Sequence, residues 1–357
     1  MDGTNHESAP RVFIVSKVLL NPYVQLLRGA IGEAGIQCQV VRDFGLPWLR
    51  DHRGQVDVVH LHWPEMLYQY DDLGQRLRRT VSVIGAILLA RVWGVRLVYT
   101  VHNLTPHERP YPICSTLVDW FLYRCADAIH VHDAMMAERV ARQSGRRRGI
   151  HVIDHGNYIG AYPNECTRED ARRMLDLDPS ALVYLFLGQV REYKGLELLL
   201  DAYEAVRTET SVLLVAGRAR DEKYGREVRA AVAGRPGVRL HLGFVPDDRV
   251  QYYMKACDVC VLPYRQVTTS GAAILALSFG VPVVAPRMGC FLGLIGESRG
   301  ILYDPDRPGS LADALVQVGD ADLAAFGRAG LEYARTLDWG PIGRQHASLY
   351  RGLLSHS

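Results

Sequence analysis

The sequence predicts an α/β protein made of two doubly wound domains, each with a parallel sheet between layers of helices. Short apolar runs recur along all 357 residues, and segments with helical period separate them. Runs that are apolar throughout suit strands buried on both faces of a parallel sheet, and their alternation with helices is typical of βαβ units. At about 100–200 residues per domain, the length also indicates two domains.

Each half of the chain contains six expected strands. Those of the first half are Val12–Ser16, Cys38–Val41, Asp57–His62, Arg96–Val101, Ala128–His132 and Ile150–Ile153. Those of the second half are Leu182–Leu187, Val212–Ala216, Arg239–Leu242, Val259–Pro263, Pro282–Ala285 and Ile301–Tyr303. Two of the helices between them have clear apolar faces, which are Leu73, Leu77, Val81, Ile84, Leu88 and Val92 in one and Leu196, Leu199, Leu200, Tyr203 and Val206 in the other.

A stretch rich in turn residues, from Asn157 to Pro179, separates the two halves. We therefore expect domains at residues 1–157 and 158–338, followed by a closing helix at 339–357 whose apolar face includes Trp339 and Leu353. In doubly wound sheets, ligands bind outside the carboxyl ends of the strands. The expected site is a central cleft in which these ends of the two domains face each other.

Composition excludes several classes of function. Lys plus Arg total 41 against 39 for Asp plus Glu, so no large net charge attracts nucleic acid. The seven cysteines are scattered, and the pair Cys257 and Cys260 fits the entry into a buried strand, which implies a reducing, cytoplasmic compartment. Residues 1–10 lack an apolar signal core, and the longest apolar stretch, Val81–Ala90, is about half of a bilayer span. We expect a cytoplasmic chain that does not cross a membrane.

Two loops at expected strand ends are suited to bind a diphosphate. The first, Gly188–Gly195, leads directly into a helix, so a tight glycine turn and free backbone N–H groups come together. In this loop Arg191 offers a forked contact to phosphate and Lys194 offers a point charge. The alternative is a surface loop with two solvated cations.

The second loop, Tyr264–Ala273, places Thr269, Ser270 and Gly271 at the start of an apolar helix. Hydroxyls and backbone N–H groups there suit an anion, and the alternative is ordinary N-capping by Thr269 or Ser270. No Walker A sequence occurs, and no GxGxxG motif follows the first strand of either half. These absences exclude P-loop NTPases and argue against nicotinamide or flavin binding.

Four stretches resemble the GT-B glycosyltransferases, especially glycosyltransferase family 4 and its close relatives. They are FLGQVREYKG at 186–195, VLPYRQVTTSGAAILALSFGVPVVAP at 261–286, YTVHNLTPHE at 99–108 and VIDHGNY at 152–158. The resemblance covers nearly the whole chain. It implies two Rossmann-like domains, of which the first binds the acceptor and the second the nucleotide sugar, with the final helix crossing back to the first domain.

The resemblance also implies a metal-independent hexosyltransferase with no cofactor besides its donor substrate, a nucleotide-diphosphate sugar such as GDP-mannose or a UDP-hexose. The acceptor would be a glycan, a glycolipid or a small molecule. Arg191 and Lys194 would neutralise the departing diphosphate, and Ser270 and Gly271, beside Thr269, would contact its phosphates.

The chain departs from the family pattern at three positions. Gln189 stands where many members have an arginine. Val267 and Leu275 stand where many members have the two glutamates that contact the ribose and the donor sugar. At these positions the resemblance does not imply the family's donor-sugar contacts.

The amino-terminal half supplies the catalytic candidates. His102 occupies the place of the family's histidine that faces the donor sugar, and an imidazole titrates near neutrality. Glu65 is the second candidate, because Trp63 is close to it in sequence and can stack on a sugar ring. Glu108 is a further carboxylate, and His155 lies in the segment between the domains.

His60 and His62 point to one face of their strand, so a metal pair is the alternative to buried histidines with one partner each. We favour the buried histidines and expect no metal.

Two mechanisms stay open. Retention would use front-face attack, with the leaving diphosphate removing the acceptor proton, and the resemblance favours it. Inversion would need a base, for which His102, Glu65 and Glu108 are candidates. The rival functions are a non-hydrolysing nucleotide-sugar 2-epimerase, which would need acidic residues around the sugar, and a non-catalytic regulator that binds a sugar nucleotide.

The segment Leu73–Val92 combines an apolar face with four arginines, and Arg146–Arg148 follow in the same domain. Basic amphipathic helices can lie in the headgroup region of a membrane, which would suit a lipid-linked acceptor and peripheral attachment at the inner face of the plasma membrane. The alternative, which we favour, is that this helix covers the sheet with the apolar face inward and the arginines solvated. The sequence does not indicate an oligomeric state.

Overall fold

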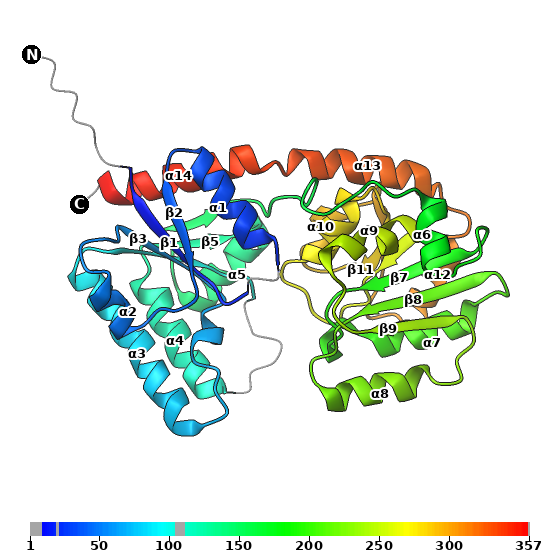
Figure 1. Ribbon diagram of the computed structural model, residues 1–357, viewed down its shortest axis with the longest axis horizontal. Helices are drawn as coiled ribbons and strands as arrows, with labels where there is room; N and C mark the ends of the chain where they lie inside the picture. Colours follow the sequence, from blue (N-terminus) through cyan, green and yellow to red (C-terminus); the bar gives the residue numbers. More distant parts are fainter. Residues whose placement is uncertain (1–8, 19–20, 104–110, 356–357) are drawn as a thin grey trace, which may run out of the picture. The chain divides into compact units, whose positions relative to one another are not determined.

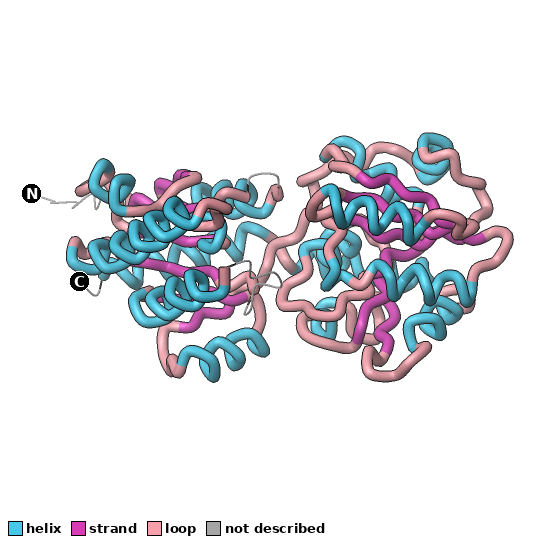
Figure 2. Tube along the Cα trace, turned by 90° about the horizontal axis from the view of Figure 1, so that it is seen from below, coloured by secondary structure: helices cyan, strands magenta, loops and turns pink. Residues whose placement is uncertain are grey.

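The computed structural model describes residues 9–18, 21–103 and 111–355. The chain divides into unit 1, Met1–Gly156 with Leu337–Ser357, and unit 2, Asn157–Thr336. Each unit contains one six-stranded parallel sheet with helices on both faces (Figures 1 and 2). The predicted α/β class with two doubly wound domains is confirmed, whereas the central cleft stays a prediction.

The six strands expected in the first half form the sheet of unit 1, in the order β2-β1-β3-β4-β5-β6. Their bounds are β1 Arg11–Val15, β2 Gln37–Val41, β3 Val58–His62, β4 Arg96–Thr100, β5 Ala128–Val131 and β6 Ile150–Val152. The strand order reverses between β1 and β3, where Ile14 pairs with His60. In open sheets such a reversal leaves a crevice at the carboxyl ends of the two strands, and ligands bind there.

The sheet of unit 2 has the same plan, with the order β12-β11-β10-β7-β8-β9. Its strands are β7 Leu182–Leu187, β8 Ser211–Gly217, β9 Val238–Leu242, β10 Val259–Val261, β11 Val283–Pro286 and β12 Gly300–Tyr303. The reversal falls between β7 and β10. The two loops expected to bind a diphosphate follow these two strands, so the topology brings them to one crevice.

Helices cover both faces of the sheet in unit 1. They are α1 Tyr23–Glu33, α2 Leu46–Asp51, the 3₁₀ turn η1 Pro64–Leu67, α3 Leu73–Val92, α4 Pro112–Cys125, α5 Ala134–Ser144 and α14 Trp339–Ser355. One core joins α2, α3, α4 and α5 to Phe13, Val59 and Leu97 of the strands. The other core joins α1 and α14 to Val12 and Val58, because side chains alternate between the faces of a strand.

The helices of unit 2 likewise lie on both faces of its sheet. They are α6 Arg168–Met174, η2 Glu192–Lys194, α7 Leu196–Val206, α8 Glu222–Val232, α9 Asp247–Ala256, α10 Gly271–Ser278, α11 Phe291–Leu294, α12 Ser310–Gln317 and α13 Leu323–Thr336. The expected face of α7 is confirmed, since Leu196, Leu199, Leu200 and Tyr203 are buried. Cys257 and Cys260 are buried without a disulfide and belong to the core of this unit.

The prediction for α3 was wrong about which face is buried. The helix buries Thr80, Val83, Ala86, Ile87 and Ala90, whereas Leu73, Leu77, Val81, Leu88 and Val92 are between 44% and 79% exposed. The helix has two apolar faces, and the one with small and β-branched residues packs closely on its neighbours. The prediction relied on the periodicity of the larger apolar side chains. This periodicity does not indicate which of two apolar faces packs against the rest of the unit. Within the described part of the chain, no helix is long and apolar enough to cross a membrane.

Docking of α14 on α1 requires a glycine at the crossing. A Cβ atom on Gly343 would lie 2.2 Å from the carbonyl oxygen of Ala30, which is backbone and cannot rotate away. Farther along the helix, the guanidinium of Arg351 donates to the carbonyl oxygen of Ala34 at 2.9 Å. The two contacts place α14 firmly within unit 1.

We predict that Gly343→Ala destabilises the protein by about 1–3 kcal/mol, the usual cost of overpacking. Gly352→Ala is the matched control, because Gly352 lies in the same helix and a Cβ there meets nothing within 4 Å. Alanine at that position should stabilise by about 0.4–1 kcal/mol. The urea midpoints of the two variants should therefore move in opposite directions, and equal shifts would contradict this docking.

Candidate functional site

The loop after β7 is shaped by two glycines with positive φ. Gly188 has φ 134° and Gly195 has φ 65°, conformations that other residues adopt only at a cost. A Cβ atom on Gly195 would lie 2.2 Å from the carbonyl oxygen of Pro263, just after β10. The loop after β7 therefore approaches the end of β10 more closely than any side chain would permit.

Both predicted cations lie in this loop. The ammonium of Lys194 lies 5.1 Å from the centre of the Tyr264 ring and near Gly188. Burial, and then the nearby charge of Arg191, lower the pKa of Lys194 to about 8. Nε and Nη2 of Arg191 donate to Oε1 of Gln189 at 3.3 and 3.2 Å. Gln189, which replaces the family's arginine, thus helps to orient Arg191.

The loop after β10 lies against the first loop. The backbone N–H of Arg265 donates to the carbonyl oxygen of Tyr193 at 2.8 Å, and the Arg265 guanidinium pairs with Glu197 at 2.7 Å. The structure brings both predicted phosphate loops together at the switch point of the sheet. A ligand held by one loop would be within reach of the other.

Ser270 and Gly271 begin α10. The buried Ser270 accepts a hydrogen bond from the backbone N–H of Ala273 at 3.2 Å, which is the N-capping role named as the alternative. A hydrogen bond from the side chain of Ser270 to Tyr264 also opposes the rise in the pKa of Tyr264 that burial causes. A Cβ atom on Gly271 would lie 3.2 Å from the hydroxyl of Tyr158, so this helix start is closely packed. Thr269 is partly exposed beside it.

Val267 and Leu275, which stand in place of the family's two glutamates, are surrounded by apolar side chains. Val267 is buried in the core of unit 2, and Leu275 packs against that core. A carboxylate at either place would lose its hydration, so the substitution suits the surroundings. Neither position can therefore make the carboxylate contacts of the family pattern.

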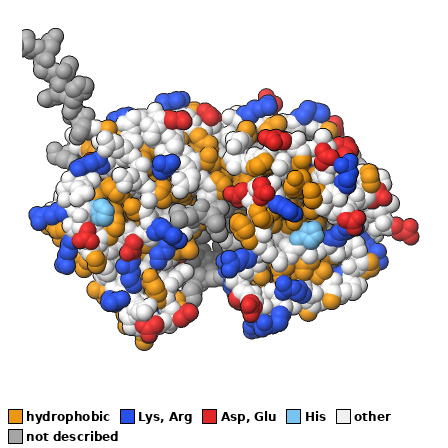
Figure 3. All heavy atoms as spheres, in the orientation of Figure 1, with side chains coloured by type: hydrophobic (Ala, Val, Ile, Leu, Met, Phe, Trp, Pro, Cys, Tyr) orange, Lys and Arg blue, Asp and Glu red, His pale blue; other side chains and the backbone are white. Residues whose placement is uncertain are grey.

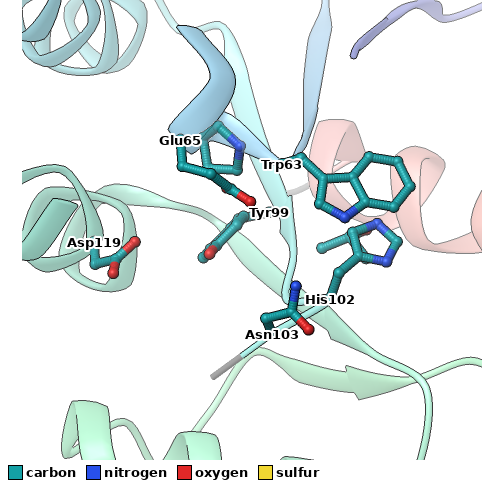
Figure 4. A pocket seen from close by; sticks show the side chains of 8 residues that line it. Trp63, Glu65, Tyr99, His102, Asn103 and Asp119 are labelled. Atoms are coloured by element: carbon teal, nitrogen blue, oxygen red, sulfur yellow. The ribbon is translucent and has the colours of Figure 1, made fainter. Parts of the chain in front are cut away.

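In unit 1 a small pocket lies at the carboxyl ends of β3 and β4. Figure 4 shows the side chains that line it, which are Trp63, Pro64, Glu65, Tyr99, Thr100, His102, Asn103 and Asp119. The structure thus brings both catalytic candidates, His102 and Glu65, to one pocket. Glu108 lies outside the described residues.

Glu65 is poised to exchange a proton near neutral pH. Burial, with a smaller contribution from the charge of Asp119, raises the pKa of Glu65 to about 7. In Figure 4 the carboxyl groups of Glu65 and Asp119 both point toward Tyr99. Asp119 is a site residue that sequence reasoning missed. The sequence signal that could have identified Asp119 is its place next to Val118 in a helix that contributes buried residues to the core.

His102 is held on its edge and on its face. Its Nε2 lies 2.9 Å from Nδ1 of His62, and the ring of Trp63 stacks on it at 3.8 Å with an interplanar angle of 9°. Trp63 has φ 47°, a left-handed conformation that is uncommon for a bulky residue. The residue that stacks on His102 thus has a strained backbone.

A directed chain of hydrogen bonds connects α14 to the sheet behind this pocket. Nε2 of His130 lies 2.9 Å from the carbonyl oxygen of Ile153, so it must carry the proton, and Nδ1 of His130 must accept from Thr100 at 2.8 Å. Thr100 in turn accepts from Nε2 of His60 at 2.6 Å, and Nδ1 of His60 accepts from the hydroxyl of Tyr350 at 2.7 Å. Each proton in the chain has one consistent place.

In this chain of hydrogen bonds both ring nitrogens of His60 have a partner, Tyr350 and Thr100. The described residues contain no group of three His, Cys, Asp or Glu side chains arranged to hold a metal ion. His155 lies in unit 1, where its Nδ1 donates to the carbonyl oxygen of Gly156 at 2.7 Å and its ring lies 4.6 Å from that of Tyr23.

Comparisons with known proteins agree with this geometry. Residues 181–320 match the family model described as Glycosyl transferases group 1. The chain is 26% identical to the GDP-mannose:glycolipid 4-beta-D-mannosyltransferase of Xanthomonas campestris pv. campestris, covering 97% of this chain and 94% of that protein. It is also 26% identical to the D-inositol 3-phosphate glycosyltransferase of Corynebacterium urealyticum, over 86% of this chain and 74% of that protein.

Solved structures share the fold. Sucrose-phosphate synthase from Thermosynechococcus elongatus superposes with a TM-score of 0.79 at 20% identity, covering 98% of this chain and all of that one. The Anabaena HepE protein, solved in complex with UDP, gives 0.75 at 16% identity, covering 96% and 100%. The fold and the two switch-point sites define a GT-B protein. The chain thus has the fold of the GT-B glycosyltransferases, and its residues 181–320 are similar to the group 1 glycosyl transferases.

Among the described residues of unit 1, seven histidines are buried, and burial lowers the pKa of each below its ordinary value. They are His60, His62, His102, His130, His132, His155 and His346. The unfolded chain, with an ordinary pKa of about 6.5, therefore binds more protons. Stability is fully present above that pH and is lost as the pH falls below it. Each proton taken up on unfolding contributes about 1.4 kcal/mol per pH unit.

We predict that the urea midpoint falls steeply between pH 6.5 and about 5, before ordinary carboxylates titrate. The His346→Leu variant lacks one of these groups, whose pKa is about 4 in the fold, and should show a shallower slope. Midpoints that stay level across this window would show that the imidazoles are already charged in the folded protein.

Proposed function

We propose that the protein transfers mannose from GDP-mannose to a lipid-linked glycan acceptor. The observation that carries this proposal is the pair of loops in unit 2, where Arg191 and Lys194 lie beside a glycine turn and the start of α10. The similarity to a GDP-mannose:glycolipid mannosyltransferase over 97% of the chain supports the choice of donor and acceptor.

In this mechanism the cations of unit 2 stabilise the charge that develops on the leaving diphosphate. Arg191 contributes a planar fork of N–H donors, and Lys194 contributes a compact charge near the turn at Gly188. The backbone N–H groups at the start of α10 add partial positive charge. Contacts of this kind are preorganised, so they need not rearrange as the bond to the sugar breaks.

Glu65 is the group best suited to take the proton of the acceptor hydroxyl. A general base works best when its pKa is close to the working pH, and that of Glu65 is about 7. A base permits direct displacement with inversion at the anomeric carbon. We therefore propose inversion in place of the retention that the family resemblance favours, which is also consistent with the missing glutamates at Val267 and Leu275.

The same two apolar positions argue against the 2-epimerase, which would need acidic side chains around the sugar. Incubation with a panel of labelled nucleotide sugars, with and without a lipid-linked glycan, separates the functions. The proposal expects transfer from GDP-mannose that depends on acceptor. Formation of an epimerised nucleotide sugar would support the 2-epimerase. Binding of the nucleotide sugar without turnover, even with acceptor present, would support the non-catalytic regulator.

We also propose that unit 1 attaches to an anionic phospholipid surface through α3 and α4. These helices pack against each other (Figure 1). Their exposed apolar residues, which we call the apolar rows, are Leu73, Leu77, Val81, Leu88 and Val92 of α3 and Ile113, Leu117 and Trp120 of α4. Exposed apolar area of this kind, rimmed by charge, marks an interaction surface.

The charges beside the apolar rows are basic. An open depression is lined by Arg91, Arg124, Arg146, Arg147 and Arg148, and its single acidic residue, Asp127, pairs with Arg96. The guanidinium of Arg124 lies 4.7 Å from the ring of Trp120, which joins the basic depression to the apolar rows. Figure 3 shows basic side chains among apolar ones on unit 1. Arginines near an anionic membrane each contribute about 1 kcal/mol of attraction.

The proposed mechanism predicts a bell-shaped dependence of kcat/KM on pH. The rate should rise as Glu65 loses its proton near pH 7 and fall as Lys194 loses its charge near pH 8. Glu65→Gln should lower turnover about 10²–10⁴-fold and remove the acid limb. Lys194→Arg should remove the alkaline limb, because a guanidinium stays charged throughout this range. If the pH profile of either variant is unchanged, the residue replaced in that variant is not the group that titrates in that limb.

Attachment to membranes predicts that the protein sediments with vesicles containing phosphatidylglycerol at low salt, where electrostatic screening is weakest. Val81→Asp, in the apolar rows, should release it into the supernatant. Val316→Asp is the matched control, because Val316 is a similarly exposed valine in unit 2, at 57% against 66%. If both variants sediment like the wild type, α3 is not the attachment surface.

A further inference from the structure

The contact between His62 and His102 requires one of the two rings to donate. Nδ1 of His62 and Nε2 of His102 lie 2.9 Å apart, and His62 is almost completely buried. Burial lowers the pKa of both imidazoles, so each ring is neutral and carries a single proton. The proton between them therefore belongs either to Nδ1 of His62 or to Nε2 of His102.

The surroundings of His62 decide between these two arrangements. Its other nitrogen, Nε2, is buried without a hydrogen-bond partner among the described residues. A proton on that atom would be a buried N–H with no acceptor, and such groups are rare and cost about 1–3 kcal/mol. His62 therefore keeps its proton on Nδ1 and donates it to Nε2 of His102.

Trp63, the residue after His62, packs against the face of the His102 ring. Trp63 stacks on His102 at 3.8 Å, and its backbone is in the left-handed conformation. Consecutive residues thus hold His102 by its edge and by its face, as Figure 4 shows for Trp63. Strained conformations of bulky residues cost about 1–3 kcal/mol and are concentrated at functional sites.

We propose that His62 is a positioning residue that fixes the proton of His102 on Nδ1, so that His102 presents an N–H donor to the pocket. Nδ1 of His102 has no partner among the described residues, which leaves it available to a substrate oxygen. In this tautomer His102 has no free lone pair, because its Nε2 is occupied. His102 therefore orients a substrate oxygen and does not act as the base, a division of roles that rests on the proposed function and leaves proton removal to Glu65.

The test compares two replacements of His62. His62→Leu removes the donor, so His102 should adopt the Nε2–H form and kcat should fall about 10- to 100-fold, as when a partner that orients a histidine is lost. His62→Asn keeps an N–H near the position of Nδ1 and should restore most of kcat. The effect should fall on kcat more than on KM. Nitrogen-15 NMR of the imidazoles shows directly which ring nitrogen of His102 carries the proton.

His346→Leu is the control for loss of a buried imidazole. His346 lies in the same unit, and its Nδ1 donates to the carbonyl oxygen of Ile342 at 3.0 Å rather than to His102. This variant should lose stability and keep both kcat and the tautomer of His102. The proposal is overturned if wild-type His102 carries its proton on Nε2, or if His62→Leu turns over like the wild type. If the wild type transfers no sugar, the proposed function fails, and the NMR measurement still decides the role of His62.

Discussion

The burial of ionisable side chains behind the carboxyl ends of β3, β4 and β5 is the constraint on which unit 1 depends. Imidazoles on this face of the sheet have lost their hydration, so they stay neutral and their protons must be placed by hydrogen bonds. The chain from Tyr350 through His60, Thr100 and His130 to Ile153 accounts for each proton. It joins α14 to the sheet, and it forms a rigid support behind the pocket.

This constraint also divides the chemical roles in the pocket. Desolvation moves the two kinds of ionisable group in opposite directions, because it disfavours the charged form of each. The histidines become poor proton acceptors, whereas the carboxyl of Glu65 acquires a pKa of about 7. In unit 2 the same loss of hydration lowers the pKa of Lys194 to about 8. Between these two values the proposed base, Glu65, and the proposed diphosphate ligand, Lys194, are both charged.

Much of the architecture was predictable from the sequence, because the apolar runs are long and fall in regular alternation with helices. All twelve strands are where the pattern placed them, and the two loops of unit 2 meet because parallel strands end at one edge of the sheet. The buried face of α3 was not predictable, since both of its faces are apolar. Asp119 was missed because Glu65, which lines the same pocket, is distant in sequence. The contact of His62 with His102 joins two strand ends, and neither motif alone indicates it.

The central claim is that unit 1 supplies a carboxylate tuned to accept a proton near neutral pH. The most direct test is a carbon-13 NMR titration of the Glu65 carboxyl group, assigned with the Glu65→Gln variant, in the protein without substrates. The account predicts a midpoint near pH 7. A midpoint near the ordinary value of 4.5 would show that Glu65 is solvated, and the proposed base would have to be abandoned.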